Sequence, residues 1–163
     1  MITLYSGNGK GKTLACIGAT IKASLKDKKV LFVDFINSDY ITELKSLSSM
    51  YTVTTMSAPI DIELYTQVDA DNKPQLSKIF RELFNSATRT VLLGKFDLLI
   101  LDGVFDATNK GLLPDSEIYD FLSNVPNSLD IVCTGIKIDD KFSPLATFVT
   151  ELTDKKLNEE SPS

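Results

Sequence analysis

The sequence lacks two residue types altogether: its 163 residues include no histidine and no tryptophan. Without histidine, the chain has neither the usual general base of enzymes nor the commonest protein ligand of transition metals. Any chemistry must therefore rely on carboxylates, hydroxyls, lysines or a bound ion. Cysteine is scarce as well. Cys16 and Cys133 lack the spacing of a zinc site and suggest no disulfide framework, so we interpret both as small buried hydrophobic residues.

Long apolar runs and a secretory signal are also missing. No run reaches the roughly 18 apolar residues that a membrane helix needs, and no basic start is followed by an apolar stretch. We therefore expect a cytoplasmic protein without a membrane partner. The formal net charge of -5 also disfavours a nucleic-acid partner, because a phosphate backbone repels an acidic chain.

What the chain does contain is an alternation of strand-like and helix-like segments. Apolar and β-branched runs predict strands at residues 2–5, 29–36, 51–56, 96–102 and 129–134. Helical spacing predicts helices at residues 12–25, 41–48 and 114–123. The clearest helix has one apolar face, formed by Leu76, Ile79, Phe80, Leu83, Phe84, Ala87 and Val91. We interpret residues 57–73 as a long loop with one helical turn, and residues 142–152 as a short helix and an edge strand.

The strongest motif lies between the first strand and the first helix. It follows the P-loop pattern, except that a serine stands at the first glycine position: Ser6-Gly7-Asn8-Gly9-Lys10-Gly11-Lys12-Thr13. Glycines allow the backbone to turn its N–H groups toward one anion, and the N-terminus of the following helix adds positive potential. Lys12 supplies a charge for the outer phosphates, and Thr13 offers a hydroxyl to magnesium. We call residues 6–13 the glycine loop and predict that it binds a nucleoside triphosphate.

A second element supports this prediction. The apolar strand at residues 98–101 ends in Asp102, and an aspartate in this position beside a P-loop is the usual magnesium ligand. Together, the loop and the alternating elements predict an α/β fold of the P-loop NTPase type, a three-layer sandwich with a mostly parallel central sheet covered by helices on both faces. We expect one domain over residues 1–152, followed by a flexible tail at 153–163.

The segment from Tyr5 to Thr13 resembles the opening of the P-loop ATP:corrinoid adenosyltransferases, which also tend to have a small hydroxylated residue where Ser6 stands. The resemblance continues through most of the chain outside residues 57–91, at residues 28–30, 33–36, 97–102, 111–113, 132–135, 145–146 and 149–152. It implies transfer of the 5′-deoxyadenosyl group of ATP to a cobalt(I) corrinoid with release of triphosphate. It implies that ATP and magnesium bind at residues 6–14, from Ser6 to Leu14. It also implies that Lys12 and Asp102 are catalytic residues and that Thr13 and Asp102 are metal ligands. Members of the family often form homodimers.

The chain departs from the family pattern at several positions. Leu14 replaces a second hydroxyl, Gly103 replaces a metal-linked glutamate, and Ile136 replaces an arginine. The stretch from Pro59 to Glu63 lacks the family's aromatic pair, and the basic end of the last segment is replaced by residues 155–159. Two functions therefore stay open. One is a divergent adenosyltransferase with Tyr65 or nearby apolar groups against the corrin; the other is a non-catalytic nucleotide-binding relative. A phosphoryl-transfer enzyme is a distant third, because no base or second substrate clamp is recognisable.

Several other side chains have two interpretations. Asp34 ends the second strand and either faces the site or lies in a turn. Phe105 either stacks on a ligand ring or belongs to the core. Four aspartates in turns and loops are interpreted as surface residues rather than cation ligands: Asp69, Asp71, Asp139 and Asp140.

Overall fold

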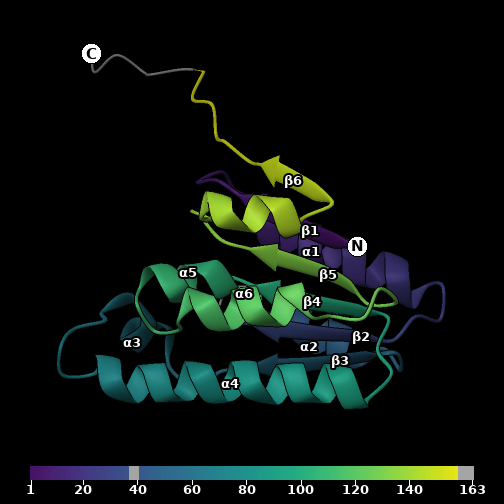
Figure 1. Ribbon diagram of the computed structural model, residues 1–163, viewed down its shortest axis with the longest axis horizontal. Coiled ribbons are helices and arrows are strands. Elements are labelled where there is room, and N and C mark those ends of the chain that lie inside the picture. Colours follow the sequence, from purple (N-terminus) through teal and green to yellow (C-terminus); the bar gives the residue numbers. More distant parts are fainter. Residues whose placement is uncertain (37–40, 158–163) are drawn as a thin grey trace.

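The computed structural model describes residues 1–36 and 41–157, which form one six-stranded, fully parallel sheet between two layers of helices (Figure 1). The strands are β1 (Ile2–Ser6), β2 (Val30–Asp34), β3 (Val53–Ser57), β4 (Leu98–Asp102), β5 (Asp130–Thr134) and β6 (Phe148–Glu151). The helices are α1 (Lys12–Ser24), α2 (Ile41–Ser48), α3 (Ile62–Thr66), α4 (Lys73–Leu93), α5 (Val104–Asn109), α6 (Asp115–Ser123) and the 3-10 helix η1 (Asp140–Leu145).

The order of strands in the sheet is β3-β2-β4-β5-β1-β6. Every pair of neighbouring strands is parallel, so the carboxyl ends of the strands share one edge, and the arrowheads visible in Figure 1 point the same way. In-register pairing places Asp34 of β2 beside Asp102 of β4 at that edge. The predicted α/β sandwich with a parallel sheet is confirmed. In open α/β sheets, ligands commonly bind beyond the carboxyl ends of the strands, which here is the edge where β1, β4 and β5 end.

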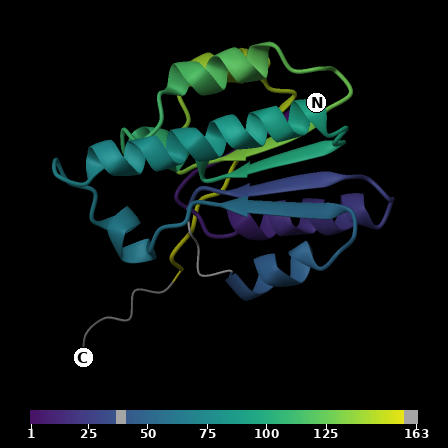
Figure 2. The same cartoon turned by 90° about the horizontal axis from the view of Figure 1, so that it is seen from below.

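Helices cover the two faces of the sheet unequally. Figure 2 shows α1 and α2 on one face and α4 and α6 on the other. The buried strands β2 and β4 are apolar along their length because both faces are covered, apart from the aspartate that ends each. The larger core lies under α4, α5 and α6, and the smaller one lies under α1 and α2.

The predicted elements are confirmed with small shifts of their ends, and one helix was not predicted. Helix α5 has six residues and follows Gly103 directly, so it is too short to show an apolar period. Helix α1 also packs differently from what its apolar spacing suggests. Leu14 and Ile21 on that helix, and Leu25 just after it, are exposed, whereas small residues such as Cys16 and Thr20 are buried.

The last part of the chain leaves the sheet after β6, an edge strand whose four residues are all exposed. Residues 152–157 form no regular element. Residues 158–163 lie outside the described residues, so most of the predicted tail and the end of segment 155–159 lie there too. In the described part, no helix is long and apolar enough to cross a membrane.

Candidate functional site

The glycine loop leaves β1 at Ser6 and enters α1 at Lys12. It is curled rather than extended, because Gly7 and Gly11 have φ angles of 99° and 111°. These angles belong to the left-handed region that only glycine adopts easily. Helix α1 then begins with backbone N–H groups at Lys12 and Thr13, and the first N–H groups of a helix have no acceptor within it. The fold therefore presents a turn and a positive helix end together.

The ammonium group of Lys12 lies across this turn. Its Nζ donates hydrogen bonds to the carbonyl oxygens of Gly7, at 2.6 Å, and Gly9, at 2.9 Å. Both contacts are part-buried, so the side chain is held at the loop rather than extended into solvent. The charge predicted to meet the outer phosphates is thus fixed on the loop before any ligand binds.

Some amides of the loop already have protein acceptors. The N–H of Gly7 donates to the carbonyl of Ile136 at 2.9 Å, and the N–H of Gly9 donates to that of Leu152 at 2.8 Å. Lys10 donates its N–H to Asp154 Oδ1 at 3.1 Å. The first two contacts connect the loop to the residues that follow β5 and β6, and they fix the loop against the edge of the sheet.

Asp102 ends β4 directly beneath the start of α1. Its Oδ2 accepts a hydrogen bond from Thr13 Oγ1 at 2.8 Å, and its Oδ1 accepts one from Thr134 Oγ1 at 2.7 Å. Thr134 Oγ1 in turn accepts the N–H of Gly103 at 2.7 Å. The three side chains are buried, and Asp102 is fully enclosed. The carboxylate of Asp102 and the hydroxyl of Thr13 therefore lie side by side where the glycine loop enters α1.

Burial is the main influence on the acidity of Asp102. It raises the pKa of this carboxyl from 3.8 to about 6, against the two threonine hydrogen bonds, which lower it. The charges of Asp34 and Asp106 raise it further. A buried carboxylate that is costly to ionise is stabilised by a cation, so the environment of Asp102 favours a positively charged ligand near neutral pH.

The donor set fits magnesium but does not form a complete cage. Thr13 and Asp102 supply oxygen ligands, which this ion prefers. Among the described residues, no group of three or more acidic or cysteine side chains is placed to hold a metal. Magnesium commonly keeps several waters and binds through one or two protein groups plus substrate phosphates. The residues present therefore fit a magnesium ion that arrives with a nucleotide.

Two further aspartates surround this centre. Asp34 is buried, and its Oδ1 accepts the N–H of Ile36 at 2.9 Å, so it both ends the strand and shapes the following turn. Asp106 on α5 accepts the N–H of Ile136 at 2.7 Å. Because the carbonyl of Ile136 accepts the N–H of Gly7, this residue connects Asp106 to the glycine loop. Burial raises the pKa of Asp106, while the positive charges of Lys12 and Lys110 lower it.

An apolar cavity of about 520 Å³ opens beside the loop. Its lining residues are Ile36, Tyr65, Asp106, Asn109, Lys110, Ile136 and Lys137. Tyr65 is 4% exposed, and its hydroxyl is the buried side-chain polar atom without a hydrogen-bond partner in the described part of the chain. Lys110 Nζ lies 4.8 Å from the centre of the Tyr65 ring. A buried hydroxyl without a partner is unfavourable, so this cavity is suited to a ligand that offers an acceptor.

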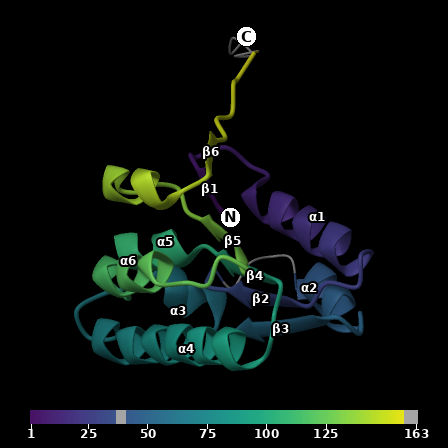
Figure 3. The same cartoon turned by 45° about the vertical axis from the view of Figure 1, so that its right-hand side comes forward.

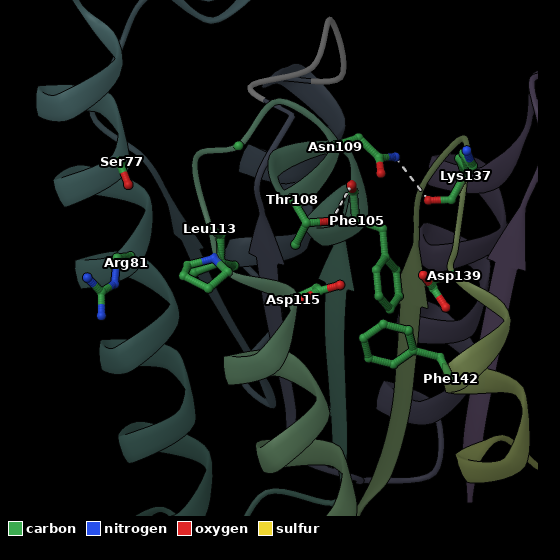
Figure 4. A pocket seen from close by; sticks show the side chains of 12 residues that line it. Ser77, Arg81, Phe105, Thr108, Asn109, Leu113, Asp115, Lys137, Asp139 and Phe142 are labelled. Atoms are coloured by element: carbon green, nitrogen blue, oxygen red, sulfur yellow. Dashed lines mark hydrogen bonds between the residues drawn. The ribbon is translucent and has the colours of Figure 1, made fainter.

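A second cavity of about 440 Å³ lies between α4, α6 and η1 (Figure 4). Asn109 and Lys137 line both cavities, and Asn109 Nδ2 donates to the Lys137 carbonyl at 2.9 Å. Phe105 and Phe142 pack edge to face at its wall, with ring centroids 4.7 Å apart. Phe105 is buried, and this aromatic pair belongs to the core under α6.

The remaining predicted residues lie apart from the loop or on its rim. Leu14 is 53% exposed in the first turn of α1, next to the loop. Asp69 and Asp71 lie in an exposed turn, where Asp69 Oδ1 accepts backbone N–H groups, as predicted for surface residues. Asp139 caps η1 by accepting the N–H of Lys141, and Asp140 begins that helix. Cys16 and Cys133 are free and buried, as predicted.

Three contact residues were missed in the sequence. Thr134 contacts Asp102, Asp154 contacts Lys10, and Asp106 reaches the loop only through Ile136; none of the three belongs to the P-loop motif. A signal existed for Thr134, because a polar residue ending a buried parallel strand lies at the same edge as Asp102. Asp106 lies on the unpredicted helix α5. The contact of Asp154 depends on the path of irregular chain after β6, which no local pattern encodes.

Comparison with known proteins gives a consistent result. The profile of the family described as ATP:corrinoid adenosyltransferase BtuR/CobO/CobP matches residues 1–161. The chain is 27% identical over 152 residues to the corrinoid adenosyltransferase of Escherichia coli (strain K12), a match that covers 93% of this chain and 76% of that protein. The corrinoid adenosyltransferase of Escherichia coli O6:H1 (strain CFT073) matches with the same identity and coverage.

Proposed function

The chain belongs to the ATP:corrinoid adenosyltransferase family, and from this premise we propose that it transfers the 5′-deoxyadenosyl group of ATP to a cobalt(I) corrinoid. The observation that carries the proposal is the pairing of Thr13 with the buried Asp102 beside a curled glycine loop and an apolar cavity. One part of this arrangement suits a triphosphate and the other suits a large apolar ring. The two adjoin, because Ile136 contacts both the loop and the cavity.

In this proposal, the glycine loop binds the triphosphate of ATP. The backbone N–H groups at the start of α1 and the ammonium of Lys12 face the phosphates, and they neutralise charge that builds up on the leaving group. Lys12 is already held over the loop by Gly7 and Gly9, so its side chain loses little conformational freedom on binding. Thr13 and Asp102 would hold magnesium, which supplies charge neutralisation for the phosphate oxygens.

The corrin ring is assigned to the apolar cavity. Ile36 and Ile136 offer apolar surface there, and Tyr65 offers a hydroxyl donor that has no partner in the described part of the chain. Burial raises the pKa of Tyr65, so its hydroxyl stays protonated and can donate to a carbonyl on the rim of the ring. The second cavity, reached past Asn109 and Lys137, provides space for the substituents of the ring.

The reaction needs no general base from the protein, which agrees with a chain that has no histidine. The reduced cobalt of the substrate attacks carbon 5′ of ATP with its electron pair, and a cobalt–carbon bond forms. The bond from carbon 5′ to the phosphate oxygen breaks, and triphosphate leaves with that electron pair. The residues of the chain position the two substrates, neutralise the leaving group and exclude water.

A spectroscopic assay tests this function. Under strictly reducing conditions, the protein with ATP, magnesium and reduced cobalamin should convert the cobalt(I) spectrum into that of an alkylated corrinoid. Lys12→Ala should lose this conversion. The non-catalytic alternative is favoured by Gly103, which stands where the family has a metal-linked glutamate. ATP binding without any spectral conversion at high protein concentration would select that alternative.

A further inference from the structure

The segment that follows β6 lies directly on the glycine loop. Figure 3 shows the chain leaving β6 beside the turn that precedes α1. Leu152 is held from both sides, because its N–H donates to Ser6 O at 2.9 Å and its carbonyl accepts the N–H of Gly9 at 2.8 Å. A Cβ added at Gly7 would lie 2.1 Å from the Leu152 oxygen. The contact is therefore close, and the loop and the segment are positioned as one unit.

Two residues further on, this segment brings a negative charge to the loop. Asp154 Oδ1 accepts the N–H of Lys10 at 3.1 Å. Both residues are exposed, so this contact lies at the surface of the molecule. No ion pair within the described residues includes Asp154. The acceptor on this amide is thus a carboxylate from another part of the chain, 144 positions away.

A carboxylate at this place has a direct consequence for a polyphosphate. The two anions would compete for one amide, and even without direct competition they would repel each other at the rim of the loop. The same interaction acts on ATP as it binds and on triphosphate as it leaves. It is weakened by solvent and salt, because Asp154 and Lys10 are both exposed.

We propose that Asp154 is an intramolecular competitor of the triphosphate: it occupies the Lys10 amide when the loop is empty and is displaced when a polyphosphate binds. This inference rests on the proposed binding of triphosphate by the glycine loop. The competition by Asp154 would favour release of the product triphosphate. Triphosphate carries the same phosphates as ATP without the adenosyl group, so a competing carboxylate in the loop limits the retention of a tightly held leaving group.

The test is calorimetric titration of inorganic triphosphate into the wild-type chain and two variants at low ionic strength. Asp154→Asn keeps the size and an oxygen acceptor but removes the charge, and Asp154→Ala removes both. We expect both variants to bind triphosphate roughly 2- to 10-fold more tightly, with the gain shrinking as salt is added. Asp120→Asn on α6 is the matched control for net charge and should bind like the wild type.

The result also separates this inference from the proposed function. Equal or weaker binding by both Asp154 variants, with wild-type binding intact, overturns the role of Asp154 and leaves triphosphate binding in place. Absence of binding by the wild type and all variants overturns both. The amide resonance of Lys10 gives a second readout: it should differ between the wild type and Asp154→Asn in the free protein and coincide once both are saturated with triphosphate. An identical resonance in both free proteins contradicts the inference.

Discussion

Thr13 Oγ1 and Asp102 Oδ2 lie 2.8 Å apart, although 89 positions separate them in the sequence. The distance is short because β1 and β4 end at the same edge of the sheet, with β5 between them. Thr134 at the end of β5 holds the other carboxylate oxygen. A hydroxyl from the start of α1 is thereby paired with a fully buried carboxylate, and this pair lies at the buried side of the proposed nucleotide site.

The first prediction concerns the free energy that is needed to ionise the buried Asp102 carboxyl in the folded protein. The pKa of Asp102 is raised from 3.8 to about 6, mainly by burial. The folded state therefore holds its proton more tightly than the unfolded state, and the stability of the wild type falls as pH rises between these two values. Asp102→Asn removes that penalty. We expect the variant to be more stable at pH 7.5 by on the order of 1–3 kcal/mol, as measured by urea unfolding.

The pH dependence of the stability difference between Asp102→Asn and the wild type tests this explanation. The gain should be absent near pH 4, grow as pH approaches 6 and stay constant above it. Asp120→Asn on the exposed surface should show no such trend. A constant difference between pH 4 and 7.5 would mean that the ionisation of Asp102 carries no energetic penalty.

The second prediction is a loss of nucleotide affinity in Lys12→Ala. The variant removes a charge-assisted contact to the phosphates, and contacts of this type contribute about 1.5–3 kcal/mol. ATP affinity in the presence of magnesium should therefore fall roughly 10- to 100-fold by calorimetry. Lys22→Ala changes the same charge near the other end of α1 and should bind ATP normally. Equal affinity in the two variants would move the site away from the glycine loop.

The third prediction concerns Gly103, where the family pattern has a glutamate. Its φ is 75°, and an added Cβ would lie 1.9 Å from Ile36 Cγ1. Gly103→Ala should destabilise the fold by on the order of 2–4 kcal/mol, from the left-handed backbone and the overlap together. In an Ile36→Ala background the two closest overlaps, with Cγ1 and Cδ1, are removed and only Cβ remains, 3.2 Å away. The same change should then cost about 1–2 kcal/mol, mainly from the backbone. Equal costs in both backgrounds would show that Ile36 does not fill this space.

Much of the fold could be predicted because its signals are local. Buried parallel strands such as β2 and β4 are continuous apolar runs, and α4 has a strong helical period. The glycine loop follows from its motif. Contacts between distant segments could not be predicted in this way. The bond from Lys10 to Asp154 depends on irregular chain, and the isolated hydroxyl of Tyr65 depends on what α3 packs against.

The fourth prediction uses this Tyr65 hydroxyl. Because it is buried without a partner in the described part of the chain, Tyr65→Phe should stabilise the free protein by about 1 kcal/mol. The same variant should bind cobalamin several-fold more weakly, measured as quenching of tyrosine emission, because it loses the proposed donor. Tyr51→Phe at an exposed position should leave cobalamin affinity unchanged. Cobalamin affinity that is equal in all three proteins would remove Tyr65 from the corrin site.

In the proposed reaction, the glycine loop holds the triphosphate as an intact leaving group while carbon 5′ of ATP is attacked. Phosphorus magnetic resonance of the products after a single turnover with reduced corrinoid measures this most directly. We expect inorganic triphosphate in an amount equal to the alkylated corrinoid, with no ADP. Formation of ADP and orthophosphate, or ATP left unchanged in the presence of reduced corrinoid, would contradict it.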